Sequence, residues 1–436
     1  MDAAMAITGD GRVTQTMEFL SRLLEGYTGN GFSVRLWNGA TWPEHGCNKP
    51  RITLVLNHPG ALRNTFWPPT EATMGEGYIF GDYDLLGEVE ALFEVVDYLS
   101  NRVTDLPRWL GCARRLLTLP AGEHPLDGRR FARFQGLIHS RARDRQAIRY
   151  HYDVSNDFYA LWLDSRMVYS CAWFTDPAES LDRAQQRKID LICRKLGLQP
   201  GERLLDIGCG WGGLIQHAAA HYGVEALGIT LSKAQAGYAR ERIEEAGLSS
   251  RCRVELMDYR DLPGSNRFDK IASVGMFEHV GESRLEQYFR RAFELLKPGG
   301  RFLNHGITEA VGRPKTRGPS FIDRYVFPDG ELLPISTTLN TAEAVGFEVR
   351  DLESLREHYA LTLRHWVRRL EERHRQAVLA ADEVTYRIWR LFMAGSAHNF
   401  HTGLINVYHA LLLKPQGGPS GLPLSRGCWY ADGGGS

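Results

Sequence analysis

The pattern of apolar and polar residues changes near residue 150. Beyond it, short apolar runs alternate with longer amphipathic stretches, which is typical of a parallel sheet covered by helices. The pattern predicts strands over 202–207, 225–230, 252–256, 268–275 and 299–305. It predicts helices over 181–196, 211–222, 233–247 and 282–296. Parallel strands joined through helices in this way require right-handed crossovers.

The first hundred residues follow another pattern. Two runs rich in β-forming residues, 32–37 and 52–59, flank a turn region and predict a small antiparallel unit. Apolar residues at helical spacing predict a helix over 85–103. We therefore expect a small α+β domain over 12–105. Prolines and glycines between 119 and 128 break any helix, so 106–149 is predicted to be a linker and 150–430 a larger α/β domain.

Length and composition agree with two ordered domains. The chain has 436 residues, of which 43% are hydrophobic. It has no run of about 18 apolar residues and no basic or apolar leader, so we expect a soluble, cytoplasmic protein. Its 7 cysteines are scattered without a Cys-x-x-Cys pair, which argues against a disulfide scaffold or a structural zinc site.

Charge is balanced overall but unevenly distributed. Residues 1–101 contain 6 Lys or Arg against 13 Asp or Glu, whereas 102–149 contain 11 arginines against 4 acids. Two interpretations of this basic band stay open: an ordinary solvated surface, or a surface that binds an anionic partner such as lipid headgroups. The arginines concerned are Arg129, Arg130, Arg133, Arg141, Arg143 and Arg145. No nucleic-acid-binding module is recognised, so we expect no nucleic-acid partner.

A glycine-rich turn follows the first predicted strand of the larger domain. In RLLDIGCGWGGL (203–214), glycines let the backbone turn tightly and approach a ligand at the carboxyl end of the strand. The spacing is Gly-x-Gly-x-Gly, which differs from the dinucleotide fingerprint and disfavours a nicotinamide cofactor. Thr230 and Gln235, near the end of the next strand, can bond ribose hydroxyls, and Tyr259 can contact a purine face.

Six segments occur in one order along the chain: HYDVSNDFYALWLDSRMVYSCAWF (151–174), LDIGCGWGG (205–213), GITLSKAQ (228–235), MFEHVG (276–281), LKPGGRFLNHGIT (296–308) and HYALTLRHW (358–366). Together they resemble the cyclopropane fatty acid synthases, including the mycolic acid cyclopropane synthases. The resemblance implies a class I methyltransferase fold, which is Rossmann-like, for the larger domain. The smaller domain is similar, more weakly, to the lipid-associated domain that precedes it in bacterial members.

The resemblance also implies a reaction and a cofactor. The methyl group of S-adenosylmethionine would be transferred to the cis double bond of an unsaturated phospholipid acyl chain. The resulting carbocation would lose a proton from the new methyl group and close a cyclopropane ring. The residues implied to hold S-adenosylmethionine are Tyr169, Ser170, Gly208, Cys209, Gly210, Gly212, Thr230, Leu231, Gln235, Tyr259 and Arg260.

A second set of positions corresponds to the family's site for a bicarbonate ion, the expected general base. These residues are Cys171, Glu278, His305, Ile307 and Tyr359. His305 and Tyr359 would donate from their side chains, and Cys171 and Ile307 would contribute backbone groups. Considered singly, Cys171 fits a buried apolar residue and His305 a core histidine. Only their joint occurrence favours an ion site.

One position departs from the family. Ser396 stands where many members have a cysteine once proposed as a nucleophile, which argues against covalent cysteine catalysis. Three alternative functions remain: an acyl-chain methyltransferase that leaves a methylene or methyl branch, a small-molecule methyltransferase of the same family, or a silent lipid-binding protein.

The charge asymmetry suggests where the chain acts. We expect the acidic first segment and the basic band to organise the protein peripherally at the inner face of a membrane, where unsaturated phospholipid acyl chains are its partners. A homodimer is compatible with this hypothesis.

Overall fold

The computed structural model describes residues 2–29, 31–43, 49–103, 106–132, 134–152, 154–313 and 320–430, with the side chains of 2–10 and 101–110 left aside. Cys47 and Arg133 lie outside the described residues. Contacts within the chain divide it into two compact units. One comprises Met1–Phe131, Lys315–Pro328 and Ala377–His398, and the other comprises Ala132–Pro314, Asp329–Gln376 and Asn399–Ser436. The division into 12–105, 106–149 and 150–430 stays a prediction about independent folding.

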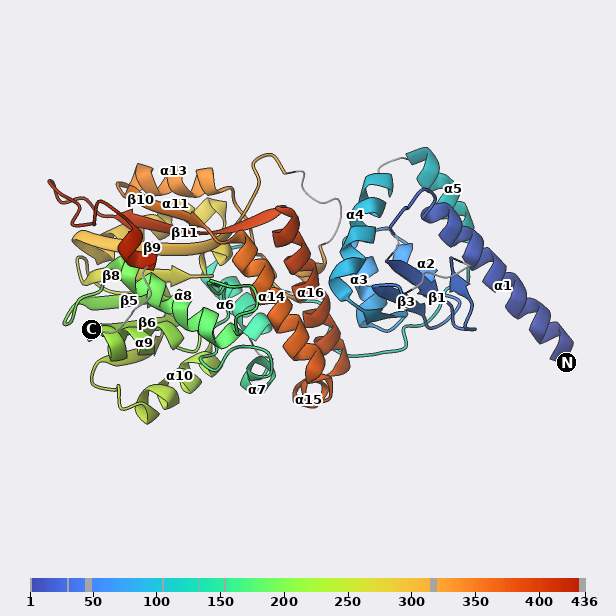
Figure 1. The fold of residues 1–436 in the computed structure, drawn as a ribbon, viewed down its shortest axis with the longest axis horizontal. Coiled ribbons are helices and arrows are strands. Elements are labelled where there is room, and N and C mark those ends of the chain that lie inside the picture. Colours follow the sequence, from blue (N-terminus) through green and yellow to red (C-terminus); the bar gives the residue numbers. More distant parts are fainter. Residues whose placement is uncertain are drawn as a thin grey trace. The chain divides into compact units, whose positions relative to one another are not determined.

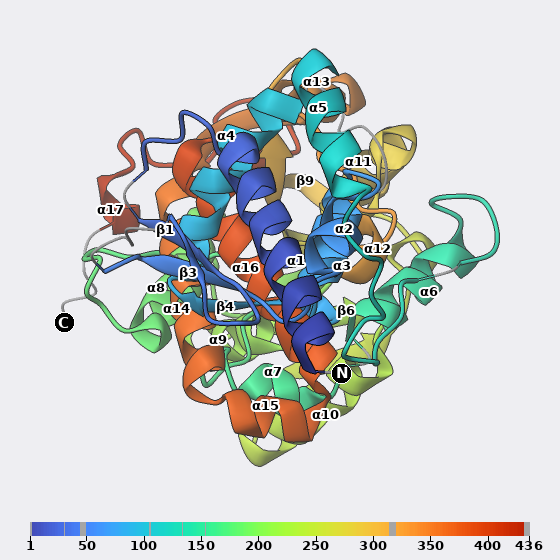
Figure 2. The same cartoon turned by 90° about the vertical axis from the view of Figure 1, so that its right-hand side faces the viewer.

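The first unit is an α+β structure around a small sheet. Its elements are α1 (Asp2–Leu23), β1 (Phe32–Arg35), β2 (Thr41–Trp42), β3 (Ile52–Leu56), α2 (Ala61–Phe66), α3 (Glu71–Ile79), β4 (Tyr83–Gly87), η1 (Val89–Ala91), α4 (Leu92–Val103), α5 (Leu106–Leu116) and α12 (Phe321–Tyr325). Figure 2 shows α1 and these strands in blue. Helices α15 (His374–Ala380) and α16 (Glu383–Thr402) contribute residues to both units.

The small sheet corrects the predicted antiparallel unit. Its strand order is β2-β1-β3-β4, and the two predicted runs, which become β1 and β3, pair in parallel. Strand β2 folds back on β1 and takes the antiparallel position beside it. The opposite edge of β1 is therefore left for β3, which returns in the same direction as β1. Strand β4 then pairs antiparallel with β3.

The helix predicted over 85–103 begins later. Leu85 lies in β4, and the helix α4 starts at Leu92. Gly87 has a φ of +105°, and a side chain there would collide with the backbone oxygen of Arg51. Because this conformation cannot continue a helix, the apolar pattern is divided between a strand and a helix. The predicted linker also contains regular structure, namely α5 and most of α6 (Arg141–Tyr152).

The second unit alternates strands and helices as predicted. After α6 its elements are α7 (Asn156–Ala160), α8 (Leu181–Leu196), β5 (Arg203–Ile207), α9 (Gly213–Tyr222), β6 (Glu225–Thr230), α10 (Lys233–Glu245), β7 (Cys252–Leu256), η2 (Tyr259–Asp261), β8 (Phe268–Val274), η3 (Phe277–His279), α11 (Glu282–Leu295), β9 (Leu296–Glu309), α13 (Ile335–Val345), β10 (Glu348–Ser354), α14 (Arg356–Glu372), β11 (Ile405–Leu413) and α17 (Gly427–Tyr430). Strands β10 and β11 were not predicted, and β9 is longer than its predicted range.

These strands form one seven-stranded sheet in the order β10-β11-β9-β8-β5-β6-β7 (Figure 1). The pairs from β9 to β7 are parallel, whereas β11 runs antiparallel to both β9 and β10. The predicted α/β class of the larger domain, with a mainly parallel sheet covered by helices, is confirmed. Among the residues that the structure describes, no helix combines the length and the apolar character needed to cross a membrane.

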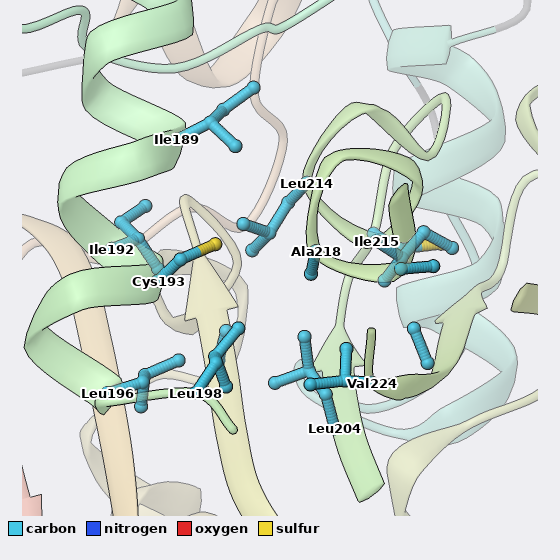
Figure 3. Packing of buried hydrophobic residues seen from close by; sticks show 14 of the residues in the cluster. Ile189, Ile192, Cys193, Leu196, Leu198, Leu204, Leu214, Ile215, Ala218 and Val224 are labelled. Atoms are coloured by element: carbon cyan, nitrogen blue, oxygen red, sulfur yellow. The ribbon is translucent and has the colours of Figure 1, made fainter. Parts of the chain in front are cut away.

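Apolar layers cover both faces of this sheet. On one face, α8, α9 and α10 contribute aliphatic residues that pack on Leu204, Ala272 and Leu303. Figure 3 shows Cys193 of α8 pointing toward Leu214 of α9 within this layer. On the other face, α11 and α13 cover Leu205, Ile271 and their neighbours. Burial on both faces fixes the register of the central strands, and therefore the positions of the loops that follow them.

One glycine of β9 allows a close approach that positions a neighbouring loop. A side chain at Gly306 would overlap the buried ring of Phe277, the residue before Glu278. Gly306→Ala should therefore lower the free energy of unfolding by about 1–3 kcal/mol because the ring must move. Denaturant titration of the full chain measures this loss. In the matched control Gly237→Ala, the new methyl group of α10 meets no atom within 4 Å, so stability should rise. Equal stability of Gly306→Ala and wild type would contradict the prediction.

Candidate active site

A cavity lies at the carboxyl ends of β5, β6, β7 and β8, which run side by side in the second unit (Figure 1). Open α/β sheets bind ligands at this edge. Ten of the predicted cofactor residues line the cavity: Tyr169, Ser170, Gly208, Cys209, Gly210, Thr230, Leu231, Gln235, Tyr259 and Arg260. Gly212 is the exception, since it precedes α9 and its neighbour Gly213 lines the cavity instead.

The glycine turn brings backbone to the floor of this cavity. Gly208, Gly210 and Gly212 have φ values of +80°, +54° and +85°. A side chain at Gly208 would meet Met276 at 2.9 Å, so the turn and the loop after β8 approach closely only because glycine is present. The turn therefore leaves backbone rather than side chains facing the space in which a ligand would lie.

Polar side chains after β6 are fixed by bonds to one another. The Thr230 hydroxyl donates to Gln235 Oε1 at 2.8 Å, and both residues are buried. Ser232 caps α10 by accepting from the Gln235 backbone N–H at 3.3 Å. These bonds hold an amide and a hydroxyl at the position where a nucleotide-binding sheet contacts ribose.

In the loop after β7, the guanidinium of Arg260 is held by two aspartates. Arg260 donates to both carboxylate oxygens of Asp258, at 2.8 and 2.6 Å, and to Asp144 of α6 at 2.9 Å. Its guanidinium is thus held by two carboxylates. Hydrogen bonding from Arg260 opposes the effect of burial and leaves the pKa of Asp258 below its ordinary value. Tyr259 is buried and packs edge-on against Tyr288.

Two buried charged residues, Lys188 and Asp206, also line the cavity, and Lys188 was not predicted from the sequence. Lys188 of α8 is 2% exposed, and its ammonium donates to the Ser170 hydroxyl at 2.8 Å. Burial lowers the pKa of Lys188 to about 8. Burial raises the pKa of Asp206, at the end of β5, to about 7, although Lys188 opposes this shift. The signal for Lys188 was its place on the apolar face of a predicted helix, with Leu181, Ala184 and Ile192.

The residues predicted to form the ion site do not line this cavity. Glu278 lies just beyond it, in η3, and its Oε1 accepts from the Ile307 backbone N–H at 2.7 Å. Its Oε2 is buried, and none of the described residues hydrogen-bonds to that atom. Burial raises the pKa of Glu278 to about 7. Ile307 is therefore next to Glu278 as predicted, but its N–H is already engaged by the carboxylate.

Tyr359 and Cys171 lie near this carboxylate. Burial, the neighbouring Cys171 and then Glu278 raise the pKa of Tyr359. Burial also raises the pKa of Cys171, whose Sγ donates to backbone oxygens of Ala172 and Leu355. Cys171 is consequently a neutral thiol rather than a nucleophile. Tyr152 connects the two groups of residues, since it lines the cavity and Glu278 raises its pKa after burial.

His305 lies on the same face of β9 as Ile307, two residues earlier. It is 1% exposed, and its Nδ1 has no hydrogen-bond partner among the described residues. Burial and then the charges of Lys188 and Lys195 lower its pKa, so the imidazole is neutral. Glu278, Ile307, Tyr359 and Cys171 are thus linked by contacts and charge effects, and His305 is connected to them through its place on β9.

Aromatic side chains close the region around Tyr169. Its ring lies 5.4 Å from Trp162 and 5.3 Å from Trp366, and it stacks on His151 at 5.7 Å. Such walls exclude water and present ring faces that stabilise positive charge. The region combines a cavity, buried proton-holding groups and aromatic walls, an arrangement suited to generating positive charge on carbon and then removing a proton.

The raised pKa of Glu278 predicts a pH-dependent stability difference for Glu278→Gln. The amide can still accept from Ile307, but it does not ionise. The unfolded chain releases the Glu278 proton near pH 4.5 and the folded protein near pH 7, so wild type loses stability as the pH rises through this interval. The variant should gain stability relative to wild type over the same interval, by at most roughly 3 kcal/mol.

Thermal unfolding at several pH values between about 5 and about 8 checks this sign. The exposed Glu244→Gln on α10 serves as the control and should show a constant difference from wild type. A difference for Glu278→Gln that does not change with pH would refute the raised pKa.

Comparison with known proteins agrees with this geometry. The model of the mycolic acid cyclopropane synthetase family matches residues 139–410. A Pseudomonas putida protein named "probable fatty acid methyltransferase" is 42% identical over 401 residues, covering 91% of this chain and 95% of that protein. The tuberculostearic acid methyltransferase UfaA1 of Mycobacterium tuberculosis is 36% identical and covers 85% of each chain.

Solved structures add the fold and a ligand. The mycolic acid cyclopropane synthase CmaA1, complexed with SAH (S-adenosylhomocysteine) and CTAB, superposes with a TM-score of 0.58 at 36% identity. The match covers 62% of this chain and 98% of that chain. The chain therefore belongs to the mycolic acid cyclopropane synthetase family, and its second unit has the fold of S-adenosylmethionine-dependent methyltransferases.

Proposed function

We propose that this protein transfers the methyl group of S-adenosylmethionine to the cis double bond of an unsaturated phospholipid acyl chain and, with bicarbonate-assisted proton loss, gives a cyclopropane ring. One observation carries the proposal. Tyr152 lines the cofactor cavity and lies near Glu278, a buried carboxylate with a raised pKa. A site for the methyl donor and a group able to hold a proton are therefore adjacent.

The residues that line the cavity suit S-adenosylmethionine in their chemistry. The positive-φ glycines leave room for a ligand against the backbone, and one carboxylate oxygen of Asp206, Oδ1, is buried without a hydrogen-bond partner among the described residues. Thr230 and Gln235 would hold the ribose, and Tyr259 would contact the adenine. Ser170, oriented by Lys188, would hold the methionine end. When bound, the cofactor supplies an electrophilic methyl group.

The aromatic residues would control the charge that develops on the acyl chain. The Tyr359 ring packs at a tilt against Phe400, with ring centroids 4.6 Å apart, and its centroid lies 6.0 Å from that of Trp366. Their ring faces can stabilise a carbocation, and their packing keeps water from trapping it. Cys171 would contribute only through its backbone, because its thiol is neutral. No nucleophilic side chain is required for this route, in keeping with serine at position 396.

Glu278 and His305 would hold the base. The buried Oε2 of Glu278 and Nδ1 of His305 both lack hydrogen-bond partners among the described residues, which suits a small polar ion such as bicarbonate. Two adjacent anions repel each other, and a Glu278 pKa of about 7 lets the carboxyl group keep its proton and donate to the ion. Tyr359 would provide a second donor.

A second candidate product is favoured by the relatives. The two relatives named as fatty acid or tuberculostearic acid methyltransferases match 91% and 85% of this chain. The cyclopropane synthase CmaA1 matches only 62% of it. Methyl transfer to the same double bond can leave a methylene or methyl branch instead of a ring. The small-molecule alternative lacks this support, because these relatives, which match most of the chain, are named for fatty acid substrates.

The lipid would be reached from a membrane surface. Leu137 and Ile138, just before α6, are 83% and 59% exposed, and Arg145 and Arg149 of α6 are exposed nearby in sequence. The same helix lines the cofactor cavity through Ile148 and Tyr152. Arg143, by contrast, donates twice to Asp329, at 2.6 and 2.8 Å, so its charge is already paired. A homodimer and a position at the inner membrane face stay predictions.

Product analysis tests the reaction. The purified protein is incubated with labelled S-adenosylmethionine and liposomes of monounsaturated phospholipid, and the released acyl chains are examined by mass spectrometry and proton NMR. A gain of one CH2 with upfield cyclopropyl protons is expected. The same gain with vinylic methylene protons would support the branched product instead. Glu278→Gln should lower the rate by roughly 10²-fold or more, and no labelled lipid from wild type would refute the proposal.

Liposome sedimentation tests the membrane surface. Combined Leu137→Glu and Ile138→Glu substitutions should weaken binding to anionic liposomes by roughly tenfold or more, because two apolar side chains no longer enter the lipid. Leu424→Glu is the control, since Leu424 is also an exposed leucine but lies far along the chain from α6. Equal binding by the double variant, the control and wild type would exclude this surface.

A further inference from the structure

Three polar side chains form a row across neighbouring strands of the second unit. His305 of β9 is directly opposite His409 of β11, and His409 is directly opposite Glu353 of β10. Residues directly opposite on adjacent strands point to the same face of a sheet. The row therefore runs from the ion-site residue His305 toward the edge of the sheet.

His409 is the middle of the row and has no hydrogen-bond partner for its ring among the described residues. It is 0% exposed, and none of the described residues hydrogen-bonds to either of its ring nitrogens. Its ring centroid is 4.8 Å from that of His305, and its Nδ1 is 3.9 Å from Glu353 Oε2. A buried polar group without a hydrogen-bond partner destabilises the folded protein, so a histidine here calls for an explanation other than packing.

The surroundings keep both imidazoles neutral. Burial is the main cause that lowers the pKa of His409, and His305, Lys195, Lys188 and His358 lower it further. Burial, followed by Lys188 and Lys195, also lowers the pKa of His305. A neutral imidazole has one donor nitrogen and one acceptor nitrogen. It can therefore accept a proton on one side while it releases another on the other, without remaining charged.

Glu353 forms the outer end of the row. Its side chain is 19% exposed, whereas those of His409 and Lys195 are fully buried. Oε1 accepts from the Trp173 indole at 3.1 Å, and Oε2 lies 2.6 Å from the Lys195 ammonium. Trp173 lines a hollow at the surface of this unit. Glu353 is thus the member of the row from which a proton can reach solvent.

We propose that His305, His409 and Glu353 form the exit route for the proton that the reaction releases. The inference rests on the proposed function. A C–H bond of the transferred methyl group breaks, its electron pair forms the new carbon–carbon bond, and the proton passes to the base held by Glu278 and His305. It then moves to His409. From His409 it passes to Glu353 across the 3.9 Å between Nδ1 and Oε2, by a small ring movement or a bridging water, and leaves to solvent.

No oxidant, reductant or further reactant is needed, because each transfer breaks and forms one bond to hydrogen. His409 and Glu353 do not touch the acyl chain in this scheme and act as positioning residues for the proton. Their loss should spare methyl transfer itself and slow the return of the base to its starting state.

Rapid-quench kinetics with His409→Gln separates these steps. We expect S-adenosylhomocysteine to form at the wild-type rate in the first turnover, followed by a steady-state rate lower by roughly tenfold or more. The solvent deuterium isotope effect on the steady state should increase. In His409→Ala, added imidazole should restore turnover. Glu353→Gln, which keeps an acceptor for Trp173, should reproduce the slow steady state if His409 variants fold poorly.

His217→Gln is the matched control, because His217 is also a buried histidine of this unit but lies on α9, pairs with Asp190 of α8 and is not a member of the row. It should retain wild-type kinetics. The exit route alone is overturned if variants of His409 and Glu353 keep the wild-type steady-state rate. It is also overturned if they slow the first turnover as much as the steady state and imidazole restores neither. If the wild-type protein methylates no lipid, the proposed function is wrong, and the exit route that rests on it is wrong as well.

Discussion

The parallel pairing of β5 with β6 on one side and β8 on the other is the constraint on which the site depends. Because these strands run in the same direction, the segments that follow them meet at one edge of the sheet. Gly208, Thr230 and Met276 are distant in sequence but line one cavity for this reason. The sheet hydrogen bonds end at this edge, so the loop atoms beyond it remain available to a ligand.

Below that edge the protein buries charge where a purely structural core would place apolar residues. Lys188, Asp206 and Glu278 all have pKa values shifted toward neutrality by burial. Burial of ionisable groups is costly unless they are paired, and one oxygen of each of the two carboxylates has no hydrogen-bond partner among the described residues. Such an arrangement is typical of a functional site, because it maintains groups that exchange protons near neutral pH.

The sequence predicted what depends on local pattern. Periodicity and glycine turns were sufficient for the elements from α8 to α11, and for most of the cavity lining. The parallel pairing of β1 with β3 and the edge strands β10 and β11 depend on partners distant in sequence, which periodicity does not identify. The same limitation applies to His409, which looks like one residue of an apolar run, LINVYHALLL, until the register places it opposite His305.

The timing of proton loss links the two candidate products. In both, the proton comes from the transferred methyl group, so the same base and exit route would serve either. Ring closure joins that methyl carbon to the adjacent cationic carbon, whereas a methylene branch first needs a hydride shift that moves the charge to the carbon bearing the methyl group. A base that is regenerated quickly and held close shortens the lifetime of the cation and favours the ring. The polar row behind His305 would therefore influence the identity of the product as well as the rate of turnover, although it lies outside the cofactor cavity.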